Sequence, residues 1–123
     1  MTEAPGHTAA GLQWGRFSLV EQLANVGSEV ERTIRAHAQR QDSRFDGALA
    51  RALALFDLTA TDPRWSGPRR REVLRAREEF CRLFFDSTGA ADSAGTLQRY
   101  FLAFGIAARQ RRFNWKAGAR SSA

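Results

Sequence analysis

The chain of 123 residues is poor in cysteine, methionine, tyrosine and lysine, with one of each, and it has only three prolines. A single cysteine excludes an internal disulfide framework and a CxxC metal pair. The two histidines, His7 and His37, are too far apart in the sequence to suggest a metal site. A glycine-rich phosphate loop, a GxSxG nucleophile motif and an HExxH motif are all absent. The sequence therefore predicts no metal, no cofactor and no common catalytic machinery.

Long apolar runs are also missing. No stretch approaches the roughly 18 consecutive apolar residues of a membrane helix, so we expect no membrane contact. The first 16 residues lack a basic segment followed by an apolar run, which predicts that there is no signal peptide. Together with the lone Cys81, which fits a reducing compartment, these features predict a cytoplasmic protein.

Acidic residues are absent from the end of the chain. Residues 104–123 hold five basic side chains and no acidic one, whereas the other 103 residues hold 14 basic and 13 acidic side chains. The formal charge of +6 therefore divides into about +1 for the body and +5 for this end. Of the 19 basic residues 18 are arginine, whose planar fork of donors suits phosphate and favours a nucleic-acid partner. A GC-rich genome explains the preference for arginine equally well, but it does not explain the uneven distribution.

Apolar residues recur at helical spacings of three and four, and no segment alternates like a β-strand. We therefore predict an all-α protein, an antiparallel four-helix bundle over residues 17–113. A loose leader at 1–16 precedes this bundle and a basic tail at 114–123 follows it. The four predicted helices cover about residues 18–40, 44–60, 68–86 and 95–113.

Local signals predict where these helices begin. Ser18 and Glu21 have the spacing of a capping box. Pro68 suits the first turn of the third helix, because proline has no backbone N–H to leave unpaired there. Short polar residues are expected to cap the other two helices, Asp42 or Ser43 the second and Ser93 or Thr96 the fourth.

Three residues inside the predicted helices carry specific expectations. Gly27, flanked by Ala24 and Ser28, predicts a place where another helix approaches closely. Asp57 stands between apolar neighbours, so we expect it to be partly buried with an arginine partner. Cys81 lies among phenylalanine and leucine residues and is interpreted as a small core residue rather than a nucleophile.

The third and fourth predicted helices are apolar on more than one side. A helix that covers a single core needs only one apolar stripe. We interpret the surplus residues Phe85, Leu102 and Ile106 as an oligomer interface. The alternative is a thicker core.

Arginines crowd the start of the third predicted helix, in the stretch PRRREVLRAR. The positive end of a helix dipole disfavours cations, so function explains them better than stability does. In an antiparallel bundle this end lies beside the end of the fourth helix. The predicted nucleic-acid interface therefore combines Arg69, Arg70, Arg71 and Arg75 with Arg109, Arg111, Arg112, Phe113, Trp115, Lys116 and Arg120.

Two aromatic residues interrupt the basic end of the chain. Phe113 and Trp115 could stack on unpaired bases while the neighbouring arginines bind phosphates. The alternative is that both rings fold back onto the helices as an apolar cap.

Arg32 and His37 form an R-x4-H motif. Ribonucleases of the HEPN class, which are also helical, use such a motif across a dimer to act on the RNA backbone. The simpler interpretation is that His37 and Arg35 interact favourably with the C-terminal dipole of the first helix. A HEPN-like ribonuclease using Arg32 and His37 is therefore kept as an alternative, and we expect no enzymatic activity.

The stretches WGRFSLVEQLANVGSEVERTIR, RALALFDLT, RAREEFC and LQRYFLAFGIAARQRR, within residues 14–112, resemble a family of small bacterial proteins of uncharacterised activity. By size, charge and helix pattern the chain is also similar to the accessory variability determinant proteins of diversity-generating retroelements. That resemblance implies a basic four-helix bundle that forms a pentameric barrel and binds a reverse transcriptase and its RNA. It concerns architecture, and it assigns no site residue.

These observations predict a homo-oligomeric accessory protein that binds a partner protein and nucleic acid, either RNA or single-stranded DNA. The resemblance implies that the partner protein is a reverse transcriptase. A small helical subunit of an RNA-guided complex is a further alternative.

Overall fold

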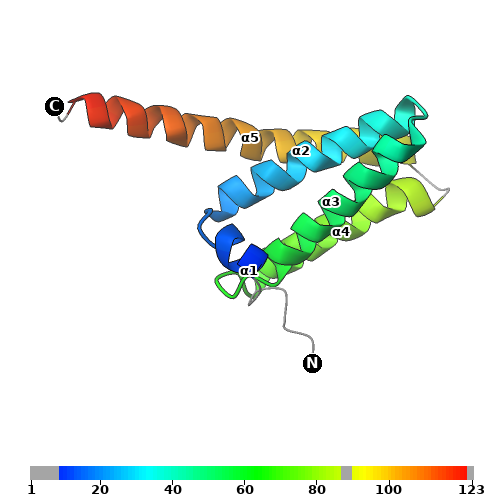
Figure 1. Ribbon diagram of the computed structural model, residues 1–123, viewed down its shortest axis with the longest axis horizontal. Coiled ribbons are helices and arrows are strands. Elements are labelled where there is room, and N and C mark those ends of the chain that lie inside the picture. Colours follow the sequence, from blue (N-terminus) through cyan, green and yellow to red (C-terminus); the bar gives the residue numbers. More distant parts are fainter. Residues whose placement is uncertain (1–8, 87–89, 122–123) are drawn as a thin grey trace.

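The computed structural model describes the backbone of residues 9–86 and 90–121 and the side chains of residues 11–86 and 94–111. This part of the chain is all-helical, as predicted. Its helices are α1 (Ala9–Trp14), α2 (Leu19–Ala38), α3 (Asp42–Ala60), α4 (Pro68–Phe85) and α5 (Ala90–Ser121). The central helix α2 packs most extensively against α3 and α5, and α4 contacts both of those helices (Figure 1).

The core lies between these helices, on the apolar stripes that the sequence predicts. Leu23, Val26 and Val30 of α2 are fully or almost fully buried. They belong to one cluster with Phe56 of α3, Phe80 of α4, and Leu97 and Phe101 of α5. Among the described residues no helix is long and apolar enough to cross a membrane.

The start of α2 agrees with the sequence. The Ser18 hydroxyl accepts a hydrogen bond from the backbone N–H of Glu21, and the Glu21 carboxylate accepts one from the backbone N–H of Ser18. This is the predicted capping box. Pro68 likewise lies in the first turn of α4, as predicted.

Two predicted caps are wrong. The N-cap of α3 is Gln41, which makes no side-chain capping bond, and Asp42 and Ser43 lie inside the helix. The helix α5 begins at Ala90, so Ser93 and Thr96 also lie inside it. Alanine at positions 90 and 91 favours an earlier start, because alanine has the highest helix propensity.

The two ends of the chain also differ from the prediction. Residues 9–14 of the predicted leader form α1, whose last residue, Trp14, is buried. At the other end α5 continues to Ser121 and projects beyond the other helices (Figure 1).

Gly27 is confirmed as the point of close approach between helices. A Cβ atom added there would lie 2.7 Å from Cβ of Phe101 on α5. Asp57 has the predicted arginine partner, since Nε of Arg77 donates to its carboxylate at 3.0 Å. The predicted burial of Asp57 is wrong, because its side chain is 53% exposed. Cys81 is partly buried.

Candidate nucleic-acid interface

The predicted arginines of the third helix lie on the first two turns of α4. A turn ending at Gly67, whose φ is +59°, leads into Pro68 and the helix. This backbone conformation favours glycine, because a Cβ atom is strained at positive φ. The first turn of α4 holds no acidic residue. We call Arg69, Arg70, Arg71 and Arg75 the α4 arginine cluster; all four side chains are exposed.

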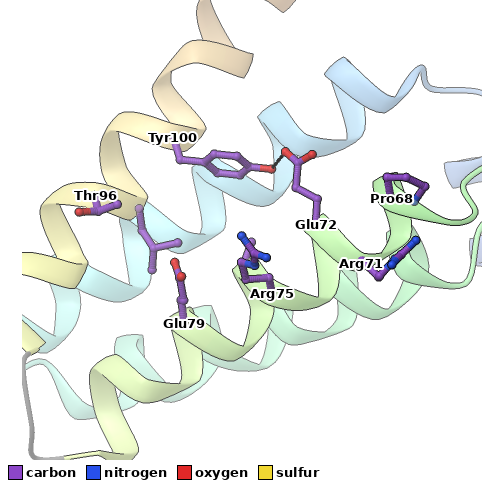
Figure 2. Close-up of a pocket in the computed structure, with 9 residues that line it drawn as sticks. Pro68, Arg71, Glu72, Arg75, Glu79, Thr96 and Tyr100 are labelled. Carbon is purple, nitrogen blue, oxygen red and sulfur yellow. Dashed lines mark hydrogen bonds between the residues drawn. The ribbon is translucent and has the colours of Figure 1, made fainter.

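A groove of about 620 Å³ separates this cluster from α5. Its α4 wall includes Arg71, Arg75 and Glu72, and its α5 wall includes Leu97 and Tyr100. Figure 2 shows Glu72 reaching towards Tyr100, whose hydroxyl donates to the Glu72 carboxylate at 2.5 Å. The acidic neighbour of the arginines is thereby held by the opposite helix.

Tyr100 keeps its proton at neutral pH. Burial raises the pKa of its hydroxyl, and the hydrogen bond to the negatively charged Glu72 raises that pKa further. Sequence analysis did not identify this pair, because Tyr100 and Glu72 belong to different helices. The signal that could have found it is the hydroxyl itself, which needs a partner when the ring is half-buried.

A buried polar cluster joins α1, α2 and the α3–α4 loop at the end of the molecule where α4 begins. The Gln22 amide donates to a carboxylate oxygen of Asp62 at 2.9 Å and accepts from Nε1 of Trp65 at 2.8 Å. Nε1 of Trp14 donates to the hydroxyl of Thr59 at 3.0 Å. Among the described residues, no buried side-chain nitrogen or oxygen lacks a partner.

Arg64 covers this cluster and was also missed by sequence analysis. Its guanidinium donates to both carboxylate oxygens of Asp62, at 3.1 and 2.8 Å, and to the backbone carbonyl of Phe17 at 2.6 Å. It also lies 4.5 Å from the centre of the Trp65 ring, and the Arg69 guanidinium lies 6.0 Å from the same ring. Arg64 thus connects the α4 arginine cluster to the residues just before α2.

The basic part of α5 reaches the same end of the molecule. Arg111 donates to the hydroxyl of Ser18 at 3.2 Å, one residue from the carbonyl that Arg64 contacts. Arg109 is exposed and lines a groove between α2 and α5. Arg111 and Arg64 thus contact two adjacent residues just before α2, Ser18 and Phe17. The juxtaposition of the start of α4 with the basic end of α5 stays a prediction. The side chains of Arg112, Phe113, Trp115, Lys116 and Arg120 lie outside the described ones, so the stacking and capping alternatives stay predictions.

The residues of the alternative ribonuclease site contact different parts of the protein. Arg32 donates to the Glu29 carboxylate at 2.7 Å. The His37 ring packs against the rings of Phe45 and Phe84, with centroids 5.4 and 5.0 Å away. Among the described residues, no hydrogen bond, ion pair or ring contact joins Arg32 to His37. Over the described residues, no cluster of three histidine, cysteine or acidic side chains could hold a metal ion.

The predicted interface residues are exposed. Phe85 is 71% exposed, Leu102 54% and Ile106 45%. Leu102 and Ile106 lie one turn apart on α5, so they share one side of that helix. Phe85 lies at the opposite end of α4 from the arginine cluster.

Comparisons with protein-family models, with curated proteins and with solved structures give no match.

Proposed function

We propose that the protein is a basic accessory protein that binds nucleic acid, built as an antiparallel four-helix bundle that self-associates. The observation that carries the proposal is the α4 arginine cluster. Its four exposed guanidiniums take part in none of the ion pairs among the described side chains. Charge neutralisation therefore does not account for them. Local stability does not account for them either, because cations are unfavourable at the positive end of a helix dipole.

Phosphate groups fit this cluster by chemistry. Each guanidinium offers a rigid fork of N–H donors that matches the oxygen atoms of a phosphate. The start of α4 adds the positive end of its dipole, which favours anions. Arg64 and Trp65 lie beside Arg69 on this surface, so a bound strand would meet both cationic and aromatic groups.

Binding of fluorescein-labelled single-stranded RNA, measured as a function of salt, tests the proposal. Each phosphate contact to a single strand contributes about 0.7 to the slope of log affinity against log salt. The double change Arg70→Gln/Arg71→Gln should therefore flatten the slope by about 1.4. An unchanged slope would show that the α4 arginine cluster does not contact nucleic acid.

The same helix offers a matched control. Arg77 donates to Asp57 at 3.0 Å and Arg82 donates to Glu78 at 2.9 Å, so both are already paired. Arg77→Gln/Arg82→Gln removes the same charge as the first double change. We expect its slope to differ from that of the wild type by less than half as much, which separates local contacts from a general effect of net charge.

The partner protein in this proposal is a reverse transcriptase of a diversity-generating retroelement, and the proposed location is the cytoplasm. Similarity of size, charge and helix pattern to accessory variability determinant proteins supports this partner. Co-elution of the two purified proteins in size-exclusion chromatography tests it. Separate elution at micromolar concentrations would remove the reverse transcriptase from the proposal and leave nucleic-acid binding standing.

A further inference from the structure

A second basic groove lies between the end of α2 and the start of α3. It has a volume of about 390 Å³, and four of the residues that line it are arginines. Arg32 and Arg35 come from α2, and Arg44 and Arg51 come from α3. The groove lies at the opposite end of α2 from the Ser18–Arg111 contact, so it is separate from the α4 arginine cluster. A helix of the length of α2, 20 residues, spans about 30 Å.

A single buried carboxylate organises two of these arginines. One oxygen of Glu29 accepts from Arg32 at 2.7 Å, and the other accepts from Arg51 at 3.3 Å. The Glu29 side chain is only 12% exposed, whereas those of Arg32 and Arg51 are 64% and 59% exposed. Glu29 therefore holds the two guanidiniums in place. Each guanidinium has further N–H donors that can bind a ligand in the groove.

The other two arginines are weakly held. The closest approach of Arg35 to Glu31 is 3.7 Å. Arg44 takes part in none of the ion pairs found among the described side chains. Asp42 and Asp46 are two residues away from Arg44 on either side, which places them roughly 200° around the helix from it. Four arginines thus line the groove, and none of its lining residues is acidic.

The remaining lining residues indicate what kind of ligand fits. The other lining residues are either small or polar and uncharged. The small ones are Ala36, Gly47 and Ala48, and the polar ones are Gln39, Gln41 and Ser43. Protein partners are held mainly by tryptophan, tyrosine and arginine anchors packed in pockets, and this groove offers arginine but no aromatic or large apolar residue. A chain of phosphates needs only regularly spaced cationic donors.

We propose that the α2–α3 groove is a second contact surface for the sugar-phosphate backbone of the single-stranded nucleic acid bound by this protein. The inference rests on the proposed function and adds a site at the far end of α2. A strand that contacts both surfaces crosses the length of that helix. We expect this groove to bind strands of any base sequence. Its guanidiniums bind phosphate oxygens, and none of its lining residues has an aromatic ring that could stack on a base.

The test uses the full chain and the same labelled RNA. Arg35→Gln/Arg44→Gln leaves the Glu29 bridge intact, so it exposes no unpaired buried carboxylate. We expect this variant to flatten the salt slope by about 1.4, as the change of two phosphate contacts requires. Combined with Arg70→Gln/Arg71→Gln, the flattening should reach about 2.8, because the two surfaces share no group. Circular dichroism and thermal melting verify that each variant is folded.

A charge-preserving variant and a peptide separate the possible outcomes. Arg35→Lys/Arg44→Lys should keep the wild-type slope, because it keeps both charges. An unchanged slope in Arg35→Gln/Arg44→Gln, with a flatter one in Arg70→Gln/Arg71→Gln, overturns the second surface and leaves the proposed function standing. Failure of the wild-type protein to bind RNA overturns both. Equal affinity for a poly-glutamate peptide of the same length would assign the groove to an acidic protein instead.

Discussion

Protonation of Asp62 should weaken the protein at a pH lower than an ordinary aspartate would. The Asp62 residue is 6% exposed, and its carboxylate accepts hydrogen bonds from Gln22 and Arg64. Burial alone would raise the pKa of Asp62. The hydrogen bonds from Arg64 and Gln22 outweigh burial and lower that pKa from 3.8 to about 2.

The sign and size of the effect follow from this difference. A carboxyl whose pKa is lower in the folded state stabilises the fold above its unfolded pKa and loses that contribution as the pH falls. A difference of nearly two units corresponds to about 2.5 kcal/mol, at about 1.4 kcal/mol per unit. The contribution is fully present at pH 6, about half of it is lost by pH 3, and most of it is lost by pH 2.

Urea unfolding of the wild type and of Asp62→Asn, at pH 6, 4 and 3, measures this contribution. Other carboxyl groups titrate in the same range, so the informative quantity is the difference in unfolding free energy between the two proteins. That difference should shrink by about 1 kcal/mol from pH 6 to pH 3. A difference that is constant over this range would refute the assignment of Asp62 as an ionised, hydrogen-bonded anchor of the α3–α4 loop.

Four further variants test other parts of the structure. Gly27→Val should lower the free energy of unfolding by about 1–3 kcal/mol, because its larger side chain overpacks the contact with Phe101. Gly105→Ala should raise the free energy of unfolding by up to about 1 kcal/mol in the same urea assay, because nothing lies within 4 Å of the added Cβ atom and alanine has the higher helix propensity. Leu102→Glu/Ile106→Glu should convert an oligomer into a 13.7 kDa monomer in light scattering, and a monomeric wild type would contradict the interface. Deleting 112–123 removes three basic side chains, and the salt slope for single-stranded RNA should flatten by up to about 2; an unchanged slope would assign this end to an acidic partner.

Helices with strong local signals could be predicted from the sequence. The capping box at Ser18 and the proline at Pro68 act within one turn, so the sequence contains the whole interaction. The lack of a side chain at Gly27 likewise predicted a close helix contact, although not that its partner is Phe101. By contrast, α1 depends on Trp14 bonding to Thr59, 45 residues away, and no local pattern reports such a contact.

The candidate sites divide in the same way. The α4 arginine cluster is visible in the sequence within the seven residues 69–75. The α2–α3 groove is not, because Arg32 and Arg51 come from different helices and only the shared bond to Glu29 brings them together.

The length of α5 has a consequence for the rate at which a polyanion is captured. Its 32 residues correspond to about 48 Å, against about 30 Å for the 20 residues of α2. The end of α5 therefore stands well outside the body, as Figure 1 shows. Positive charge held away from the body steers diffusing anions and raises the frequency of productive encounters. For a protein that binds nucleic acid, this arm acts on the association rate constant, while the grooves on the body set how long the complex lasts.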